Sequence, residues 1–143
     1  MPPKLEELFE QIYLHDIRLF TCPVPGSKAV TIELEGIYGI FLDPDQIQNS
    51  AEELCVAAHE LGHCMTGSTH SLSSGLDYIE RHEYRADKYA VHRILPVKQI
   101  EQAMRAGYTE LWQLAEYFDV TETFLQRALD IYRREGYSFH CKE

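Results

Sequence analysis

Two histidines and a glutamate stand together at a spacing that suits a metal-dependent hydrolase. His59 and His63 are four residues apart, so on a helix both imidazoles project from one face and can bind one ion. Glu60 follows the first histidine, which places its carboxylate beside the open coordination position. There it can take a proton from water and deliver it to a leaving amine. Because a chain of this composition contains the pattern by chance with a probability of roughly 4%, the interpretation needs a third ligand.

A third ligand is available on the next predicted helix. A hydrolytic zinc site has three protein ligands and one open position, and Glu83 can complete that set. Asp87 follows four residues later on the same face, where it can accept the second N–H of a ligating imidazole. Ala86 and Ala90 are small enough for two helices to approach closely. Glu83 and Asp87 have the basic neighbours Arg81, Arg85 and Lys88, and without the histidines this pattern would indicate a solvent-exposed helix face. The histidine pattern on the preceding helix outweighs that interpretation.

The cysteines bear on whether the metal is catalytic or structural. Cys22, Cys55, Cys64 and Cys141 form no CxxC pair, so we expect reduced thiols and not disulfides. Cys55 lies four residues before His59, and a buried small thiol is expected there. Structural zinc takes four protein ligands. A thiolate from Cys55 or Cys64 would therefore favour a structural metal, whereas a bound water would favour an enzyme.

A peptidase also needs a group that stabilises the developing oxyanion. The candidates are His70 and Tyr78, in or beside the loop after the first metal helix, and His82, next to the third ligand. The sequence does not select among them. For each we expect a solvent-exposed polar side chain, and we expect His82 to face away from Glu83.

The elements before the metal helices are one helix and a hairpin. Apolar residues at helical spacing predict an amphipathic helix over residues 4–14. Two strands are predicted over 29–34 and 37–42, and Glu35-Gly36 between them indicates a tight turn.

The metal helices have recognisable ends. Ser50, three residues before a glutamate, predicts a capping box that starts a helix at about Ala51, and Gly67 ends it. Residues 67–77 are typical of a loop. Asp77 is expected to cap the next helix, which runs to about Leu95.

The last third of the chain is predicted to be helical, over 97–106 and in two helices within 109–134. Its apolar spacing between Leu111 and Leu125 is similar to a helix-turn-helix. However, residues 108–127 contain four acids against one base, Arg127, whereas a DNA reader needs basic residues there. We therefore interpret the spacing as core packing and expect no direct contact with nucleic acid.

Composition restricts the class of protein. The chain has 143 residues and a formal net charge of -10, which is the wrong sign for tracking a phosphate backbone. No apolar run approaches the roughly 20 residues of a membrane span, and the acidic start lacks a secretory signal. We expect a single α+β domain in the cytoplasm, with a small N-terminal sheet or hairpin and zincin-type active-site helices. The metal-site core would cover about 30–96 and the helical part 97–136.

The quoted motifs carry a family resemblance. His59-Glu60-Leu61-Gly62-His63, followed by Glu83-Tyr84-Arg85-Ala86-Asp87 and then by Ile94-Leu95-Pro96, resembles the ImmA/IrrE family of metallopeptidases. The interval from the second histidine to Glu83 is similar, more distantly, to that of thermolysin-like zinc peptidases, the gluzincins. The resemblance extends over roughly residues 32–129.

The resemblance implies specific roles. His59, His63 and Glu83 would bind Zn²⁺, or Mn²⁺ or another divalent ion, and Glu60 would be the general base. Asp87 would orient an imidazole, that of His59 by similarity to the gluzincins. Family members are intracellular, often encoded on phages or integrative elements, and cleave or otherwise inactivate a helix-turn-helix repressor.

Three hypotheses follow for function. The leading one is a zinc-dependent endopeptidase that acts on a protein substrate. The resemblance alone implies that this substrate is a repressor of phage or mobile-element type. The main alternative is a non-catalytic, metal-stabilised binding module, an anti-repressor that acts by contact. A DNA-binding regulator is disfavoured by the charge.

Overall fold

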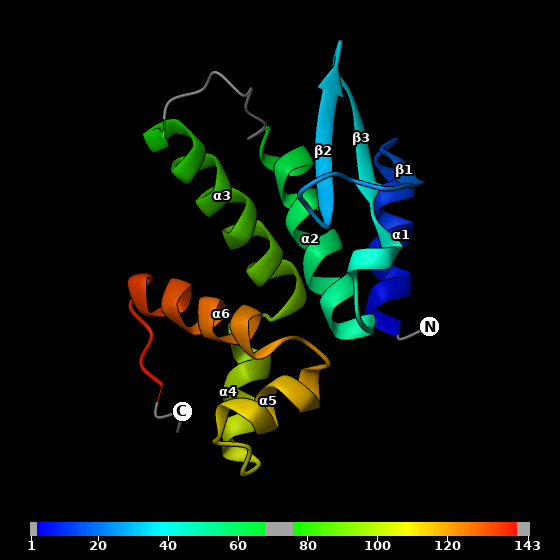
Figure 1. Ribbon diagram of the computed structural model, residues 1–143. Helices are drawn as coiled ribbons and strands as arrows, with labels where there is room; N and C mark the ends of the chain where they lie inside the picture. The colour runs from blue at the N-terminus through cyan, green and yellow to red at the C-terminus, as the bar shows by residue number, and fades with distance from the viewer. Residues whose placement is uncertain (1–2, 68–75, 140–143) are drawn as a thin grey trace.

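The helix that carries the two histidines, α2 (Ser50–Thr66), lies between a small β-sheet and the long helix α3 (Leu76–Ile94) (Figure 1). The computed structural model describes residues 3–67 and 76–139. Helix α1 (Pro3–Leu14) packs on α2 and on the sheet and buries Leu5, Leu8 and Ile12. The arrangement is the α+β fold predicted from the sequence, with the sheet in the N-terminal half.

The sheet contains β1 (Arg18–Thr21), β2 (Ala29–Leu34) and β3 (Ile37–Leu42) in the order β1–β3–β2. The predicted hairpin of β2 and β3 is confirmed, and Glu35 and Gly36 both have positive φ, 53° and 81°, as in the tight turns that match strand twist. Strand β1 was not predicted. It has only four residues, all exposed, so it lacks an alternating pattern, and it exists through parallel pairing with β3.

The ends of α2 explain where the metal helix starts and stops. Its N-cap is Asn49, whose side chain accepts a hydrogen bond from the N–H of Glu52. The predicted cap, Ser50, is wrong by one residue, because Ser50 already has helical backbone geometry. The predicted end at Gly67 is confirmed, with a left-handed φ of 63°. A 3-10 turn, η1 (Pro44–Gln46), precedes α2.

Helix α3 begins at Leu76, so Asp77 lies in its first turn and is not the predicted cap. Its contact with α2 depends on small residues. A Cβ added to Gly62 would lie 2.9 Å from the Cα of Ala86 and still closer to the Ala86 carbonyl oxygen. Ala86 and Ala90 are fully buried. The close approach predicted from the two alanines is therefore confirmed, and Gly62 supplies the other half of it.

The second half of the chain is helical, as predicted, with α4 (Val97–Arg105), α5 (Leu111–Phe118) and α6 (Glu122–Arg134). Most residues with the helix-turn-helix spacing are buried, and the others are partly buried against the same core. Leu114, Ala115, Phe118, Val120 and Leu125 are buried, and Leu111 and Phe124 are partly buried. This confirms their interpretation as core. Helix α6 packs against α3, which brings the C-terminal part next to the metal helices. Across 3–67 and 76–139, no helix is long and apolar enough to cross a membrane.

We expect Gly62→Ala to destabilise the protein, against the usual trend. In an open helix this change stabilises by about 1 kcal/mol. Here the added methyl group meets main-chain atoms of Ala86, and overpacking of this kind costs about 1–3 kcal/mol. Urea unfolding should show a lower midpoint with an unchanged slope.

The control for Gly62→Ala is Arg81→Ala, an exposed change on α3 that should alter stability by less than about 0.5 kcal/mol. Ala86→Gly should not rescue Gly62→Ala, because the obstructing atoms belong to the backbone. A midpoint for Gly62→Ala at or above the wild-type value would refute the close helix approach.

Candidate metal centre

The predicted metal-site residues meet where α2 faces α3. His59, Glu60 and His63 come from α2, and Glu83 and Asp87 come from α3. All five line one cleft of about 630 Å³. One wall of this cleft is strand β2 and another is the first turns of α6. The site is thus built by helix packing and is open to a ligand of peptide size.

Three potential ligand groups converge. The Nε2 atoms of His59 and His63 are 3.1 Å apart, and the Glu83 carboxylate lies 2.7 Å from the first and 3.2 Å from the second. Nitrogen lone pairs and a carboxylate approach this closely only around a shared cation, either a proton or a metal ion. Ligand atoms around tetrahedral zinc are about 3.4 Å apart. The donor set and its spacing therefore fit a divalent ion.

Two carboxylates compete for the third ligand position. One donor atom each of His59, Glu60 and His63 lies within 4.8 Å of the others, so proximity alone would admit Glu60. However, Glu83 contacts both imidazole nitrogens directly, whereas a carboxylate oxygen of Glu60 is engaged by Thr31. These contacts make Glu83 the candidate for the third position and Glu60 a neighbour of the ligands.

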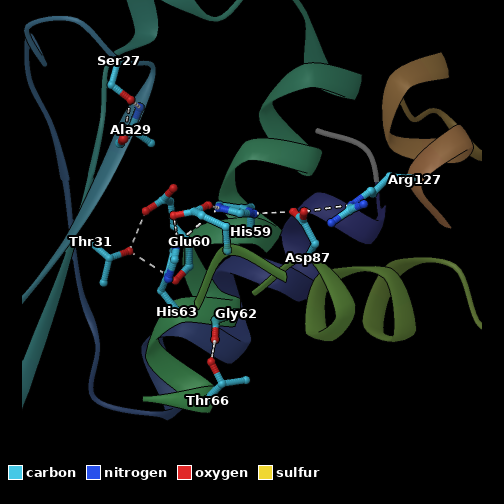
Figure 2. Close-up of polar contacts among 11 residues, drawn as sticks. Ser27, Ala29, Thr31, His59, Glu60, Gly62, His63, Thr66, Asp87 and Arg127 are labelled. Carbon is cyan, nitrogen blue, oxygen red and sulfur yellow. Dashed lines mark hydrogen bonds and ion pairs between the residues drawn. The ribbon is translucent and has the colours of Figure 1, made fainter. Parts of the chain in front are cut away.

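Asp87 fixes the orientation of the His59 ring. Its Oδ1 lies 2.7 Å from Nδ1 of His59, so Nδ1–H is donated to the carboxylate and Nε2 points toward His63 and Glu83 (Figure 2). Such a contact sets the tautomer that a metal ligand needs. The second oxygen of Asp87 accepts from Nε of Arg127 at 3.0 Å. The ligand helix α2 is thereby connected to α6 through α3.

The same contacts shift two pKa values. Burial lowers the pKa of His59, but the hydrogen bonds with Asp87 and Glu83 outweigh burial and raise that pKa to about 10. Hydrogen bonds from His59 and His63 hold the pKa of Glu83 far below its ordinary value. The Glu83 carboxylate is therefore ionised at neutral pH, as a metal ligand must be.

Glu60 is buried and held by the sheet. The hydroxyl of Thr31 on β2 donates to Oε1 of Glu60 at 2.7 Å and lies 3.3 Å from its backbone oxygen (Figure 2). This contact fixes one oxygen of the carboxylate, Oε1, and leaves the other, Oε2, for proton exchange in the proposed chemistry. A buried carboxylate with one fixed oxygen suits a general base.

The two candidate thiols do not join the ligand group. Both are buried, and burial raises the pKa of Cys55 to about 11 and that of Cys64 to about 12, so both are thiols at neutral pH. The sulfur of Cys55 accepts from the hydroxyl of Thr121. Among the described residues, the metal-type cluster contains no cysteine. The expectation of buried, reduced thiols holds for this pair, and the fourth coordination position has no protein ligand from them.

Of the three oxyanion candidates, the structure describes the side chain of His82 alone, and it does not bring His82 to the site. His82 is only 4% exposed and does not line the cleft. The expectation that it is exposed to solvent is wrong, because one step along α3 turns it from the cleft into the protein interior. His70 and the side chain of Tyr78 lie outside the described residues.

Two residues of the site were missed in the sequence. Thr31 and Arg127 are 29 and 40 positions from their partners Glu60 and Asp87. Thr31 appeared only as a strand residue, and Arg127 appeared only as the single base in an acidic segment. No spacing signal connects either residue to the histidine helix, because tertiary packing alone makes both contacts.

The comparisons with known proteins agree with this geometry. The family model for the IrrE N-terminal-like domain, peptidase family M78, matches residues 14–130. No curated protein and no solved structure matches the chain. The family supports a protease-like activity on a protein substrate, and the histidine–glutamate cluster can hold a metal ion. Because the match covers most of the 143 residues, the chain belongs to the ImmA/IrrE family of peptidases.

Proposed function

We propose that this protein is a zinc-dependent endopeptidase that inactivates a helix-turn-helix repressor by cleaving it at a specific site. One observation carries the enzymatic part of the proposal. His59, His63 and Glu83 converge in the wall of an open cleft, with the Glu60 carboxylate beside them. Three ligands with an open side and an adjacent base are what hydrolysis requires and what a structural zinc site lacks.

Each residue has a defined task in this proposal. His59, His63 and Glu83 hold the ion, which is Zn²⁺ or another divalent ion such as Mn²⁺. When bound, such an ion acts as a Lewis acid toward the scissile carbonyl and makes water more acidic. Glu60 takes a proton from the attacking water at Oε2 and delivers it to the leaving nitrogen. Thr31 keeps Oε1 of Glu60 directed toward β2 during both transfers.

The sheet offers a place for the substrate backbone. Within residues 3–67 and 76–139, strand β2 is at one edge of the sheet order β1–β3–β2, and its residues Ala29, Val30 and Thr31 line the cleft. An extended peptide can add to such an edge through main-chain hydrogen bonds. It would then pass the metal ligands, with Phe124 of α6 across the cleft.

The choice of a repressor rests on the family resemblance and on charge. DNA-binding proteins present basic surfaces to phosphates, and a chain with a net charge of -10 attracts a basic partner over distance. We place the reaction in the cytoplasm, where a repressor acts, and propose no direct contact of this chain with nucleic acid.

The alternative function is a metal-stabilised anti-repressor that acts by contact. It requires a fourth protein ligand for a closed site, and a thiol of Cys55 or Cys64 was the candidate. Among the described residues the cluster of candidate metal ligands contains neither thiol, and Cys55 contacts Thr121, which favours the enzyme. The two functions also differ in outcome, because only the enzyme produces fragments.

Glu60→Gln and Glu83→Gln are expected to separate catalysis from metal binding. Glu60→Gln should retain zinc affinity and fold but lower the cleavage rate about 10²–10⁴-fold, since an amide cannot accept the proton. Glu83→Gln should lower zinc affinity, because it removes the charge from a ligand, and cleavage should fall as a consequence. Competition with a chromophoric chelator measures affinity, and gel analysis measures cleavage. Cleavage that survives Glu60→Gln would disprove the mechanism. If Glu60→Gln lost zinc affinity and Glu83→Gln kept it, Glu60 would be the third ligand and Glu83 would not.

Thr31→Val is expected to slow cleavage about 10-fold or more without weakening zinc binding. Valine keeps the shape and strand preference of threonine but removes the donor to Glu60. The matched control is Thr21→Val on β1, an exposed strand threonine outside the cleft. Equal cleavage rates for the two variants would contradict a role for the Thr31 hydroxyl.

The repressor proposal predicts that a helix-turn-helix repressor is encoded beside this gene, and it is tested by incubating the two proteins together. With zinc we expect two discrete fragments, and with a chelator or Glu60→Gln we expect intact repressor. Mass spectrometry of the fragments gives the cleavage site. Loss of repressor function in DNA binding without fragments would support the anti-repressor instead.

A further inference from the structure

We propose that Arg127 is a positioning residue of the metal centre, which holds Asp87 so that Asp87 holds the His59 imidazole toward the ion. The inference rests on the proposed zinc ligation by His59. It gives α6, which the sequence analysis assigned only to core packing, a direct part in building the site.

The contacts form one continuous line (Figure 2). Nε of Arg127 lies 3.0 Å from Oδ2 of Asp87, and Oδ1 of Asp87 lies 2.7 Å from Nδ1 of His59. Nε2 of His59 then faces Glu83 and His63. Each carboxylate oxygen of Asp87 therefore has its own partner, so the plane of the carboxylate is determined from both sides.

Asp87 needs this second contact because it is only partly enclosed. Its side chain is 27% exposed, and a carboxylate with one partner can rotate about its Cβ–Cγ bond. Rotation would take Oδ1 away from the His59 N–H. Arg127 restricts that rotation through a charge-assisted hydrogen bond to the second oxygen.

Arg127 is itself held in place. Its guanidinium lies over the ring of Tyr84 on α3, with 5.5 Å between Cζ and the ring centroid. Arg134, two turns later on α6, lies over the same ring at 5.2 Å. Of the two arginines, only Arg127 lines the cleft and contacts Asp87 among the described residues. The chain thus offers a matched control for the loss of an arginine from α6.

A simple surface ion pair is the competing explanation. The Arg127 side chain is 37% exposed, and exposed pairs contribute little to stability. The explanations differ in what they predict. Removal of an arginine from a surface pair leaves metal affinity unchanged. Removal of a positioning residue lowers metal affinity while the metal-free protein remains as stable as before.

The experiment compares Arg127→Met, Arg127→Lys and Arg134→Met in the full chain. Zinc affinity is measured by chelator competition without substrate, and thermal unfolding of the metal-free forms reports the fold. Mutation of groups that hold ligands directly costs 10–100-fold in affinity, so one step further out we expect a loss of about 3–10-fold for Arg127→Met. Arg127→Lys should recover part of it, and Arg134→Met should match the wild type. Equal affinities for Arg127→Met and Arg134→Met would overturn the proposal.

A second measurement tests whether Arg127 acts through Asp87. Asp87→Asn keeps an oxygen for His59 but removes the charge that Arg127 binds. We expect Arg127→Met to cause no further loss of zinc affinity in the Asp87→Asn background. A full additional loss would overturn the proposed line of contacts.

The failure of this proposal can be told from the failure of the endopeptidase proposal. A wild type that binds zinc and cleaves nothing would refute the endopeptidase and not the role of Arg127. If the wild type cleaves its substrate but Arg127→Met binds zinc normally, the role of Arg127 is refuted and the endopeptidase is not.

Discussion

The close contact between α2 and α3 is the constraint on which the metal centre depends. Gly62 lies between Glu60 and His63 in sequence, and it allows the backbone of Ala86 to reach the surface of α2. Ala86 in turn lies between Glu83 and Asp87. On both helices, the residue at the point of closest packing therefore lies between the residues that carry the functional groups. A side chain at position 62 would separate the helices and pull the Glu83 carboxylate away from the two imidazoles.

Around this contact, the site is assembled from elements that belong to different parts of the chain. The sheet contributes Thr31, which holds Glu60, and α6 contributes Arg127, which holds Asp87. The groups expected to react are therefore oriented from outside their own helices. The C-terminal helices bury a core and also form a wall of the cleft. Their buried apolar positions agree with that structural task.

Much of the fold could be predicted because its signals are local. The period of α1, the turn at Glu35-Gly36 and the end of α2 at Gly67 each follow from a few adjacent residues, and the structure confirms them. The features that the sequence did not predict correctly also have physical causes. Strand β1 depends on a distant partner, Asn49 and not Ser50 caps α2, and His82 turns inward although it adjoins Glu83.

By itself, the sequence determined which groups can do chemistry. The four-residue spacing of His59 and His63 and that of Glu83 and Asp87 place each pair on one helix face, whatever the rest of the chain does. Only the tertiary structure decided how the pairs meet. It brought Glu83 to both imidazoles, and it assigned Asp87 to His59. It also added Thr31 and Arg127 as their supports, because contacts across 24 to 40 residues depend on how helices and strands pack, and no local pattern records that.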